Sequence, residues 1–260
     1  MLSVFTPSHD TRWLDQAYRS LHGQTCGDWE WVVLLNKGAY DWEPDRTDER
    51  VRVVRAHESL DTIGALKAAA CAECSGSILV ELDHDDVLLP GALDMIAAAF
   101  DEHLDATLVY SDFAHITDTG DAELSEFDAS LGWRFTMELV GETVLKRWHS
   151  FEPIPPNIGI IWFAPNHVRA FSAGAYREVG GHNPTLRVLD DLDLMHRLYL
   201  HGPFVRIPRL LYLHRVHDHN SQRDPDLNAQ IQRDTIQLYC QRREALHAAW
   251  AARLEATCLH

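Results

Sequence analysis

The sequence predicts an α/β fold built on an open, mostly parallel β-sheet flanked by helices. Over the first 110 residues, short β-rich runs alternate with stretches of helical periodicity, and this is the element order expected for such a sheet. The chain has 260 residues, of which 46% are hydrophobic, so it can bury a core without disulfides. The longest apolar run, Ile158 to Pro165, is far shorter than the ~20 residues that cross a bilayer.

The elements of the first part follow from these patterns. Strands are predicted at the β-rich runs Leu2–Thr6, Trp31–Leu35, Val51–Arg55, Ile78–Leu82 and Thr107–Tyr110. Helices are predicted at the periodic stretches Trp13–Leu21, Thr62–Cys74 and Pro90–Phe100. Pro90 is expected in the first turn of its helix, where a missing N–H costs nothing. Because ligands bind at the carboxyl ends of strands in such sheets, the residues after each strand are the first candidates for a site.

Beyond Tyr110 the periodicity weakens. Residues 112–160 contain turn signals, scattered aromatic residues and a proline-rich segment, and we expect an irregular region there. Order returns with helices predicted at Ser172–Val179 and Asp190–Leu200, and strands at Phe204–Ile207 and Leu211–Arg215. A long amphipathic helix of roughly 25–30 residues follows from about Asp226. It packs either on the body of the protein or on a second copy in a homodimer.

The charge of the chain is unevenly distributed. There are 23 Lys and Arg against 39 Asp and Glu, a formal net charge of −16, and residues 1–130 hold 26 of the acids and 8 of the bases. Such a surface repels a phosphate backbone, so nucleic acid is not expected as a partner. An anionic substrate is expected to bind through a metal.

The cysteines and the N-terminus bear on location. Five cysteines are an odd and sparse set, which indicates a reducing compartment. Cys71 and Cys74 form a C-x-x-C without a second pair, so we expect helix-core residues and not a structural zinc site. The N-terminus lacks the pattern of a signal peptide. We therefore expect a cytoplasmic protein without a transmembrane segment, with peripheral contact at the inner face of the membrane left open.

The strongest local signal is the acidic turn Asp83-His84-Asp85-Asp86 after the fourth predicted strand. Three carboxylates within four residues raise one another's pKa unless a cation lies among them. Oxygen ligands of this kind suit Mg²⁺ or Mn²⁺, which also bind substrate phosphates. A solvated turn or a helix N-cap is the alternative, and Asp86 suits that role.

Two further polar clusters adjoin predicted elements. The acids Asp190 and Asp191 begin a helix, where capping is the alternative to a chemical role. His214, His217 and His219 follow the last predicted strand, and histidine is the usual nitrogen ligand of a metal.

Together these motifs resemble the family 2 inverting glycosyltransferases of the GT-A fold. The matching order is D-x-D-D at 83–86, Gly180-Gly181 before D-D-x-D-L at 190–194, and R-x-H-x-x-N-S at 215–221. Upstream matches are Thr6-Pro7, the Q-T-x-x-x-W-E-x-x-V stretch at 24–33, the helix at 63–69 and the Y-S-D at 110–112. The resemblance covers about residues 2–222, and the joint order is more specific than any one motif.

The resemblance implies roles on the donor side. Thr6, Pro7 and Asp83 would line the nucleoside pocket, and His84 is counted with these substrate-binding residues. Asp85 and His217 would hold the Mn²⁺ or Mg²⁺ ion at the donor diphosphate. Lys67 would lie near the donor and help to neutralise the phosphates. Asn36 stands where the family commonly has an aspartate that binds the base. Because Asn both donates and accepts, a guanine or thymidine donor stays open beside the favoured UDP-sugar.

The resemblance also implies roles on the acceptor side. Asp191 would be the catalytic base, and Asp190 would help to hold the acceptor side. His182 is a candidate for contact with the donor sugar or the acceptor. Trp162 is a candidate for stacking on a sugar ring. Other aromatic residues of that region either cover the site or belong to the core: Trp133, Trp148, Phe163 and His167.

The implied reaction is the metal-dependent, inverting transfer of a sugar from a nucleoside-diphosphate sugar to a hydroxyl of a glycan or lipid-linked acceptor. A metal would stabilise the leaving diphosphate, and a base would accept the proton of the attacking hydroxyl. We expect residues 1–111 to form the donor half, 112–222 the acceptor-side half and 223–260 a helical extension. The alternatives are a metal-dependent phosphohydrolase or nucleotidyltransferase, and a non-catalytic module that binds sugar nucleotides or glycans.

Overall fold

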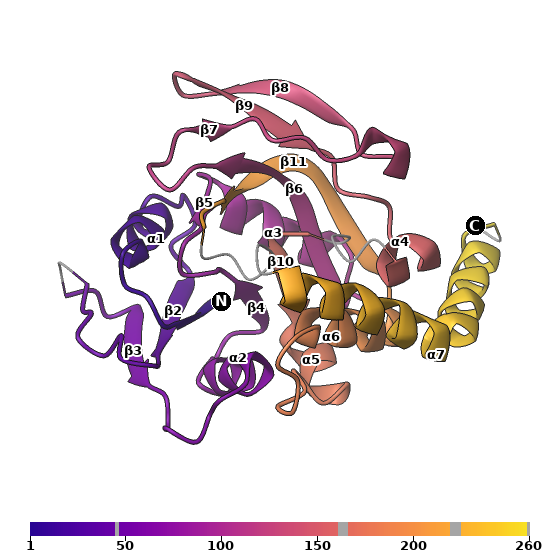
Figure 1. Ribbon diagram of the computed structural model, residues 1–260, viewed down its shortest axis with the longest axis horizontal. Helices are drawn as coiled ribbons and strands as arrows, with labels where there is room; N and C mark the ends of the chain where they lie inside the picture. Colours follow the sequence, from indigo (N-terminus) through magenta and orange to yellow (C-terminus); the bar gives the residue numbers. More distant parts are fainter. Residues whose placement is uncertain (45–46, 161–165, 219–224, 259–260) are drawn as a thin grey trace.

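The sheet of the protein lies between two layers of helices (Figure 1). The structure is a computed structural model that describes residues 1–44, 47–160, 166–218 and 225–258. Within these residues the sheet has the strand order β3-β2-β1-β4-β10-β6-β11-β5. The predicted α/β class with a mostly parallel sheet is confirmed.

The first half of the chain forms a parallel end of the sheet. Its strands are β1 (Leu2–Ser8), β2 (Trp29–Leu35), β3 (Val51–Arg55) and β4 (Ile78–Glu81). Helices α1 (Leu14–His22) and α2 (Ile63–Ala72) make the crossovers. The Thr62 hydroxyl caps α2 by accepting the N–H of Ala65 at 3.1 Å. These elements agree with the predicted ones to within two residues at each end.

The other end of the sheet mixes directions. It contains β5 (Val87–Leu88), β6 (Leu108–Ile116), β10 (Arg169–Ser172) and β11 (Phe204–Arg215). Strand β10 runs antiparallel between β4 and β6. Strand β11 is continuous where two strands were predicted, and its pairing with β6 shifts register on each side of Leu210. Pro208 interrupts the ladder there because proline lacks an N–H.

Helices cover both faces of the sheet. Helices α1 and α3 (Ala92–Glu102) pack on the face of the sheet to which Val4 points. The opposite face, to which Phe5 points, is covered by four helices: α2, α5 (Ala173–Glu178), α6 (Asp190–His201) and α7 (Pro225–Cys258). Neighbouring strand residues point to opposite faces, so the apolar run of β1 fills both cores. Helix α3 begins after Gly91, which has a left-handed φ of 80°. Pro90 therefore lies before the helix and not in its first turn, contrary to the prediction.

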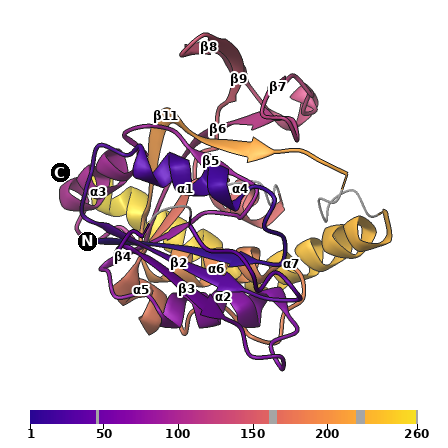
Figure 2. The same cartoon turned by 90° about the vertical axis from the view of Figure 1, so that its left-hand side faces the viewer.

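Residues 112–160 contain more regular structure than predicted. Strands β8 (Phe135–Val140) and β9 (Thr143–Trp148) form a hairpin that joins the sheet where β9 pairs with β6, and its far end projects from the body of the molecule (Figure 2). Short elements flank it: β7 (Ala122–Glu123), a 3₁₀ turn at Ala129–Leu131 and α4 (Pro155–Ile160). The apolar residues Phe135, Met137 and Leu139 alternate along β8 and are about half exposed or more. Trp133, just before β8, and Trp148, at the end of β9, are buried in the core, which confirms the core alternative for both.

Helix α7 has 34 residues, longer than predicted. It buries Ile231, Tyr239 and Leu246, and it packs against α4 and α6. Packing on the body of the protein is thus observed, and the homodimer stays a prediction. Among the described residues, no helix combines the length and the apolar character needed to cross a bilayer. Cys71 of α2 is buried in the core, as expected.

Candidate active site

Three parallel strands end together at one edge of the sheet. The main-chain N–H of Asn36, after β2, donates to the Ser8 carbonyl at the end of β1 at 2.8 Å. The pairing of Phe5 with Glu81 brings Asp83, after β4, level with Pro7. The edge predicted to bind the donor is therefore assembled from all three strand ends.

The acidic turn after β4 contacts the end of β11. Asp85 is 8% exposed, and its Oδ2 lies 2.9 Å from Nε2 of His217. Nδ1 of His84 lies 4.0 Å from the other oxygen of Asp85. Burial opposes ionisation of Asp85, but His84 and His217 outweigh it and lower the pKa of this carboxyl. Residues 132 positions apart thus meet in one acid–imidazole cluster.

Asp86 has a different role from Asp85. It is 1% exposed, and its Oδ1 accepts the main-chain N–H of Arg215 at 2.7 Å. Burial and the neighbouring carboxylates Asp85 and Asp83 raise its pKa well above the ordinary value. Asp86 therefore joins the turn to β11. It is neither a solvated turn residue nor a helix N-cap, contrary to the expectation, because its carboxylate is buried against the Arg215 backbone.

Asp83 lies beside His167. Its Oδ2 is 3.7 Å from Nε2 of His167, and about a third of its side chain is exposed. Burial raises the pKa of Asp83 to about 7, with Glu81 and Asp85 acting in the same direction against Lys67. A carboxyl whose pKa is raised by neighbouring acids gains from a nearby cation.

The site has ligands that suit a hard divalent metal. Asp85 offers a carboxylate oxygen and His217 an imidazole nitrogen, a donor set that Mn²⁺ accepts. No group of three or more Cys, His, Asp and Glu side chains among the described residues is arranged to hold a metal by itself. A two-residue set fits a metal that takes its other ligands from water and substrate phosphates.

Behind the acidic turn lies a buried network of five charged side chains. Nζ of Lys67, on α2, lies 2.6 Å from Oε1 of Glu81 and 3.2 Å from Oδ2 of Asp190. Burial would lower the pKa of Lys67, but Asp190 and Glu81 hold it well above its ordinary value. The ammonium group is thus ion-paired inside the fold and 7% exposed. The expectation that it neutralises donor phosphates directly is not supported, because both acids already surround it.

Arg169 of β10 completes this network. Its Nε lies 3.0 Å from Oε2 of Glu81, and its Nη1 donates to Oδ2 of Asp191 at 2.9 Å. Burial would raise the pKa of Glu81, but Arg169 and Lys67 lower it to about 2. Glu81 therefore stays ionised between two cations.

Asp191 lies in the first turn of α6 with 26% of its side chain exposed. Its Oδ1 accepts the main-chain N–H of Leu192 at 2.7 Å. Burial opposes ionisation, but Arg169 and Lys67 keep the pKa of Asp191 below its ordinary value. The residue expected to be the base is thus an ionised carboxylate with a solvent-facing part.

The sequence profile described as glycosyl transferase family 2 matches residues 3–161, more than half of the chain. The chain belongs to glycosyl transferase family 2. Members of this family are glycosyltransferases, so the expected enzyme class is confirmed, and the phosphohydrolase and binding-module alternatives lose their support.

Curated relatives are similar over part of their length. The chain is 27% identical over 210 residues to the uncharacterized protein y4gI of Sinorhizobium fredii, covering 76% of this chain and 20% of that protein. It is 29% identical over 120 residues to the O-antigen biosynthesis protein RfbC of Myxococcus xanthus, covering 43% and 9%. It is 21% identical over 233 residues to the chondroitin synthase of Escherichia coli, covering 85% and 30%. The chain thus spans less than a third of each of these relatives.

Solved structures of S. aureus TarS share the fold. The complex of TarS 1–349 with UDP-GlcNAc superposes with a TM-score of 0.64 at 12% identity, covering 92% of this chain and 65% of that one. The complex with UDP gives a TM-score of 0.62 at 15% identity, covering 92% and 64%. The GT-A fold expected from the family resemblance is confirmed.

Some residues of the family motifs are structural in this chain. The Thr6 side chain is fully buried, where its hydroxyl donates to the Leu82 carbonyl at 2.7 Å and accepts the indole N–H of Trp31 at 2.8 Å. Contact of Thr6 with a nucleoside stays a prediction, as it does for the buried Pro7 and Asn36. Trp162 and Phe163, like His219, lie outside the described residues.

His182 does not line an open site, contrary to expectation. It is 2% exposed and packs between Phe5 and Phe171, and the hydroxyl of Tyr176 lies 2.9 Å from its Nδ1. Burial lowers its pKa to about 3. The Gly180-Gly181 turn before it directs the side chain into the core, because Gly181 has a φ of 64° and lies against the Tyr176 ring.

Sequence reasoning missed Glu81 and Arg169. Each occupies one position in a short, largely buried strand, where a single charge gives no periodic signal. The available signal was chemical, since a charged residue inside an apolar strand must be paired. His167 was considered only as a covering aromatic residue, and the structure places it between Arg169 and Asp83.

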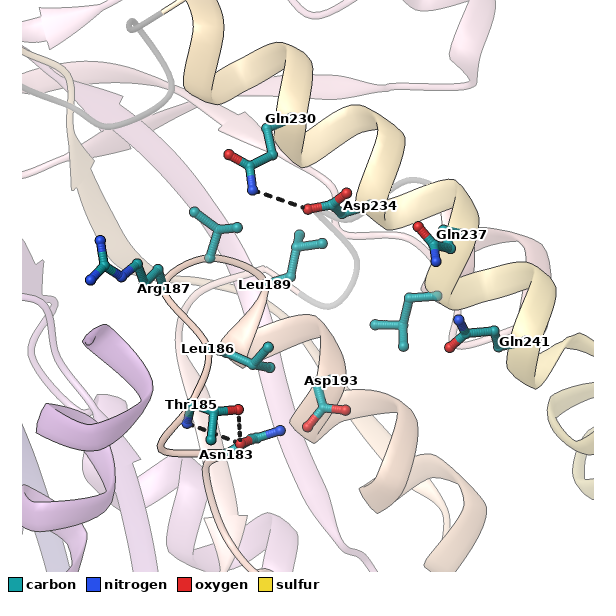
Figure 3. A pocket seen from close by; sticks show the side chains of 12 residues that line it. Asn183, Thr185, Leu186, Arg187, Leu189, Asp193, Gln230, Asp234, Gln237 and Gln241 are labelled. Carbon is teal, nitrogen blue, oxygen red and sulfur yellow. Dashed lines mark hydrogen bonds between the residues drawn. The ribbon is translucent and has the colours of Figure 1, made fainter. Parts of the chain in front are cut away.

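A groove of about 430 Å³ lies between the loop before α6 and helix α7 (Figure 3). Leu189, which directly precedes Asp190 and Asp191, lies in its wall with a left-handed φ of 59°. The polar residues lining the groove are Asn183, Thr185, Arg187, Asp193, Gln230, Asp234, Gln237 and Gln241. Amide, hydroxyl and carboxylate groups of this kind match the hydroxyl groups of a glycan.

Proposed function

We propose that the protein transfers a sugar from a UDP-sugar to a hydroxyl of a glycan or glycolipid in a single, inverting, metal-dependent displacement. The observation that carries the proposal is the link between the acidic turn and the predicted base: Asp83 of the turn faces His167, and Arg169 contacts both His167 and Asp191. The Asp85–His217 cluster lies at the donor edge of the sheet, and the Asp191 carboxylate is held by Arg169 behind it. The structures of TarS with UDP and UDP-GlcNAc support a uridine donor.

The residues of the site have separate roles in metal binding and in proton transfer. Asp85 and His217 would hold a Mn²⁺ or Mg²⁺ ion, which supplies Lewis-acid stabilisation of the leaving diphosphate. Asp191 accepts the proton of the attacking hydroxyl as the new glycosidic bond forms. No covalent nucleophile is needed, so one displacement inverts the anomeric carbon. Lys67 stabilises the acids behind the site and does not bind the donor.

The groove beside α6 supports a glycan acceptor. It adjoins the turn that carries the base, and its lining combines amides with the aliphatic side chains of Leu186, Val188 and Leu238. Its two acids and one arginine give no surplus of positive charge for an anionic ligand. An acceptor that extends from the base along this groove is the arrangement we favour. Cytoplasmic location and contact with the inner face of a membrane are further parts of the proposal, in line with a glycolipid acceptor.

A thermal-shift screen of nucleoside diphosphates with and without Mn²⁺ tests the donor side. A selective ligand stabilises the fold by mass action, so UDP with Mn²⁺ should raise the melting temperature most. The D85A variant should lose the Mn²⁺-dependent part, while D101N, at an exposed position of α3, should keep it. Equal stabilisation of D85A and wild type by UDP with Mn²⁺ would contradict the metal assignment.

Product analysis tests the reaction. Wild-type protein with UDP-GlcNAc and a panel of oligosaccharides should release UDP and form a β-linked product from the α-linked donor, as seen by NMR. D191N should lose turnover and keep donor binding. An α-linked product would exclude the inverting displacement, and full activity of D191N would exclude Asp191 as the base.

A further inference from the structure

Arg169 is a buried cation with a partner on each side. Only 4% of the residue is exposed. Its guanidinium contacts Glu81 of β4 at 3.0 Å, Asp191 of α6 at 2.9 Å and Nε2 of His167 at 3.0 Å. Burying a guanidinium is costly unless it is paired and hydrogen-bonded. The guanidinium group is planar and its N–H donors point in fixed directions, so it also orients the groups that it binds. These contacts can therefore position Asp191.

The Asp191 carboxylate is held at both oxygens. Oδ2 accepts from Arg169 at 2.9 Å, and Oδ1 accepts from the N–H of Leu192 at 2.7 Å. A carboxylate has about four lone-pair sites, so each oxygen keeps one for an incoming hydroxyl. A carboxylate with two fixed contacts loses little orientational freedom when the acceptor binds.

The charges around Asp191 come from four elements. Arg169 on β10 and Lys67 on α2 are positive, whereas Glu81 on β4 and Asp190 on α6 are negative. Arg169 alone contacts Asp191 directly among these cations. Removing it would leave Asp191 beside two acids with Lys67 committed to both of them. The ionised state of Asp191 therefore depends on the Arg169 contact.

We propose that Arg169 is a positioning residue that keeps Asp191 ionised and aimed at the acceptor hydroxyl. The inference rests on the proposed function for the role of Asp191 as base. The contact of Arg169 with His167, which faces Asp83, places the same guanidinium one side chain away from the donor edge. Arg169 thus positions the base on the acceptor side of the site, whereas the proposed metal ligands Asp85 and His217 act on the donor side.

The first test is the titration of Asp191 itself. Protein labelled with ¹³C at the aspartate carboxyl carbons gives the signal of Asp191, assigned by its loss in D191N. The R169M variant should move the titration midpoint of this signal upward by about 1–3 pH units. R169K keeps a positive charge, so Asp191 should stay mostly ionised, but a lysine cannot reproduce the fixed guanidinium contacts with both Glu81 and Asp191. An unchanged midpoint in R169M would overturn the inference whatever the substrate is.

The second test separates positioning from support of the fold. R169M leaves Glu81 underpaired, so it should lower stability; the double variant R169M/E81Q removes both charges and should regain much of that loss. The UDP-release rate with UDP-GlcNAc and an oligosaccharide acceptor should remain about 10- to 100-fold low in the double variant, with unchanged UDP affinity. Recovery of both stability and rate in the double variant would overturn the inference.

The two proposals fail in different ways. Absence of sugar transfer by the wild-type protein would refute the proposed function, whereas full turnover of D191N would remove only Asp191 as the base. Loss of turnover in D191N together with wild-type rates and pH profile in R169M would overturn only the role of Arg169. The positioning role of Arg169 is supported if the acidic limb of the pH–rate profile moves to higher pH in R169M and stays near its wild-type pH in R169K.

Discussion

Asp112 of β6 joins three parts of the fold, and replacing it tests how the β8–β9 hairpin is attached. The residue is fully buried. Its Oδ2 accepts from Nε of Arg147 on β9 at 2.8 Å, and its Oδ1 accepts from Nη2 of Arg206 on β11 at 2.8 Å. Oδ1 also accepts the main-chain N–H of Ser150 at 3.0 Å. D112A would leave both guanidinium groups without this carboxylate.

The size of the loss follows from burial. Removing one partner of a buried ion pair costs about 3–5 kcal/mol. The two arginine side chains are 15% and 19% exposed, so water reaches them in part, and we expect the lower end, about 3 kcal/mol for D112A. D112N keeps one acceptor oxygen and should lose about 1–2 kcal/mol. At about 2–4 °C per kcal/mol for a chain of this size, D112A should melt about 6–12 °C lower.

Urea unfolding followed by tryptophan fluorescence and circular dichroism measures these losses. The matched control is D61A, which removes the exposed pair of Asp61 with Arg187, 68% and 78% exposed. Such pairs contribute little, so D61A should match wild type. If D112A and D61A unfold at the same urea concentration, the reasoning from burial is wrong.

Three further predictions concern single side chains. G64A should destabilise by about 1–3 kcal/mol, because its Cβ would overlap the Asn183 carbonyl oxygen. G174A, whose Cβ would lie 3.7 Å from the Ser172 hydroxyl oxygen, should be neutral or stabilising in thermal melts. Burial lowers the pKa of His115 to about 3, so the folded state binds fewer protons than the unfolded one between pH 3 and 6.5. The free energy of unfolding therefore decreases as the pH is lowered through that window. H115Q should reduce the slope of unfolding free energy there by up to about 1.4 kcal/mol per pH unit; an unchanged slope would contradict the assignment. Iodoacetamide should modify the exposed Cys240 in the native protein, as read by mass spectrometry. The buried Cys71, whose thiol pKa is raised by burial, should react only after unfolding. Labelling of Cys71 in the native protein would contradict its burial in the core.

Local patterns predicted the parallel half of the sheet well. The strands there are continuous apolar runs, and the helices between them have clear ends, such as the Thr62 cap. The hairpin was missed because its alternating residues, Phe135, Met137 and Leu139, face outward, so their pattern did not fit a core. The two strands predicted around Pro208 are one strand, since a register shift absorbs the proline.

The candidate site residues that lie together in one short segment of the sequence could be predicted. The acidic turn and the Asp190-Asp191 pair were found from short motifs, and Asp85 contacts His217, the other residue predicted to hold the metal. The ion pairs of Lys67 depend on which acids the sheet places beside α2, and spacing along the chain carries no such information. The same holds for Arg169, because β10 enters the sheet beside β4 only after the chain has completed β6.

The insertion of β10 between β4 and β6 limits how natural or laboratory recombination can remodel this enzyme. A crossover near residue 111 would separate Glu81 from Arg169 and Gly64 from the Asn183 carbonyl that lies against it. A chimera that imports only the segment corresponding to residues 1–111 from a relative inherits mismatched partners at both places. New donor preferences are therefore expected to arise from point changes around the strand ends, or from exchanges that carry residues 169–191 along with the first half.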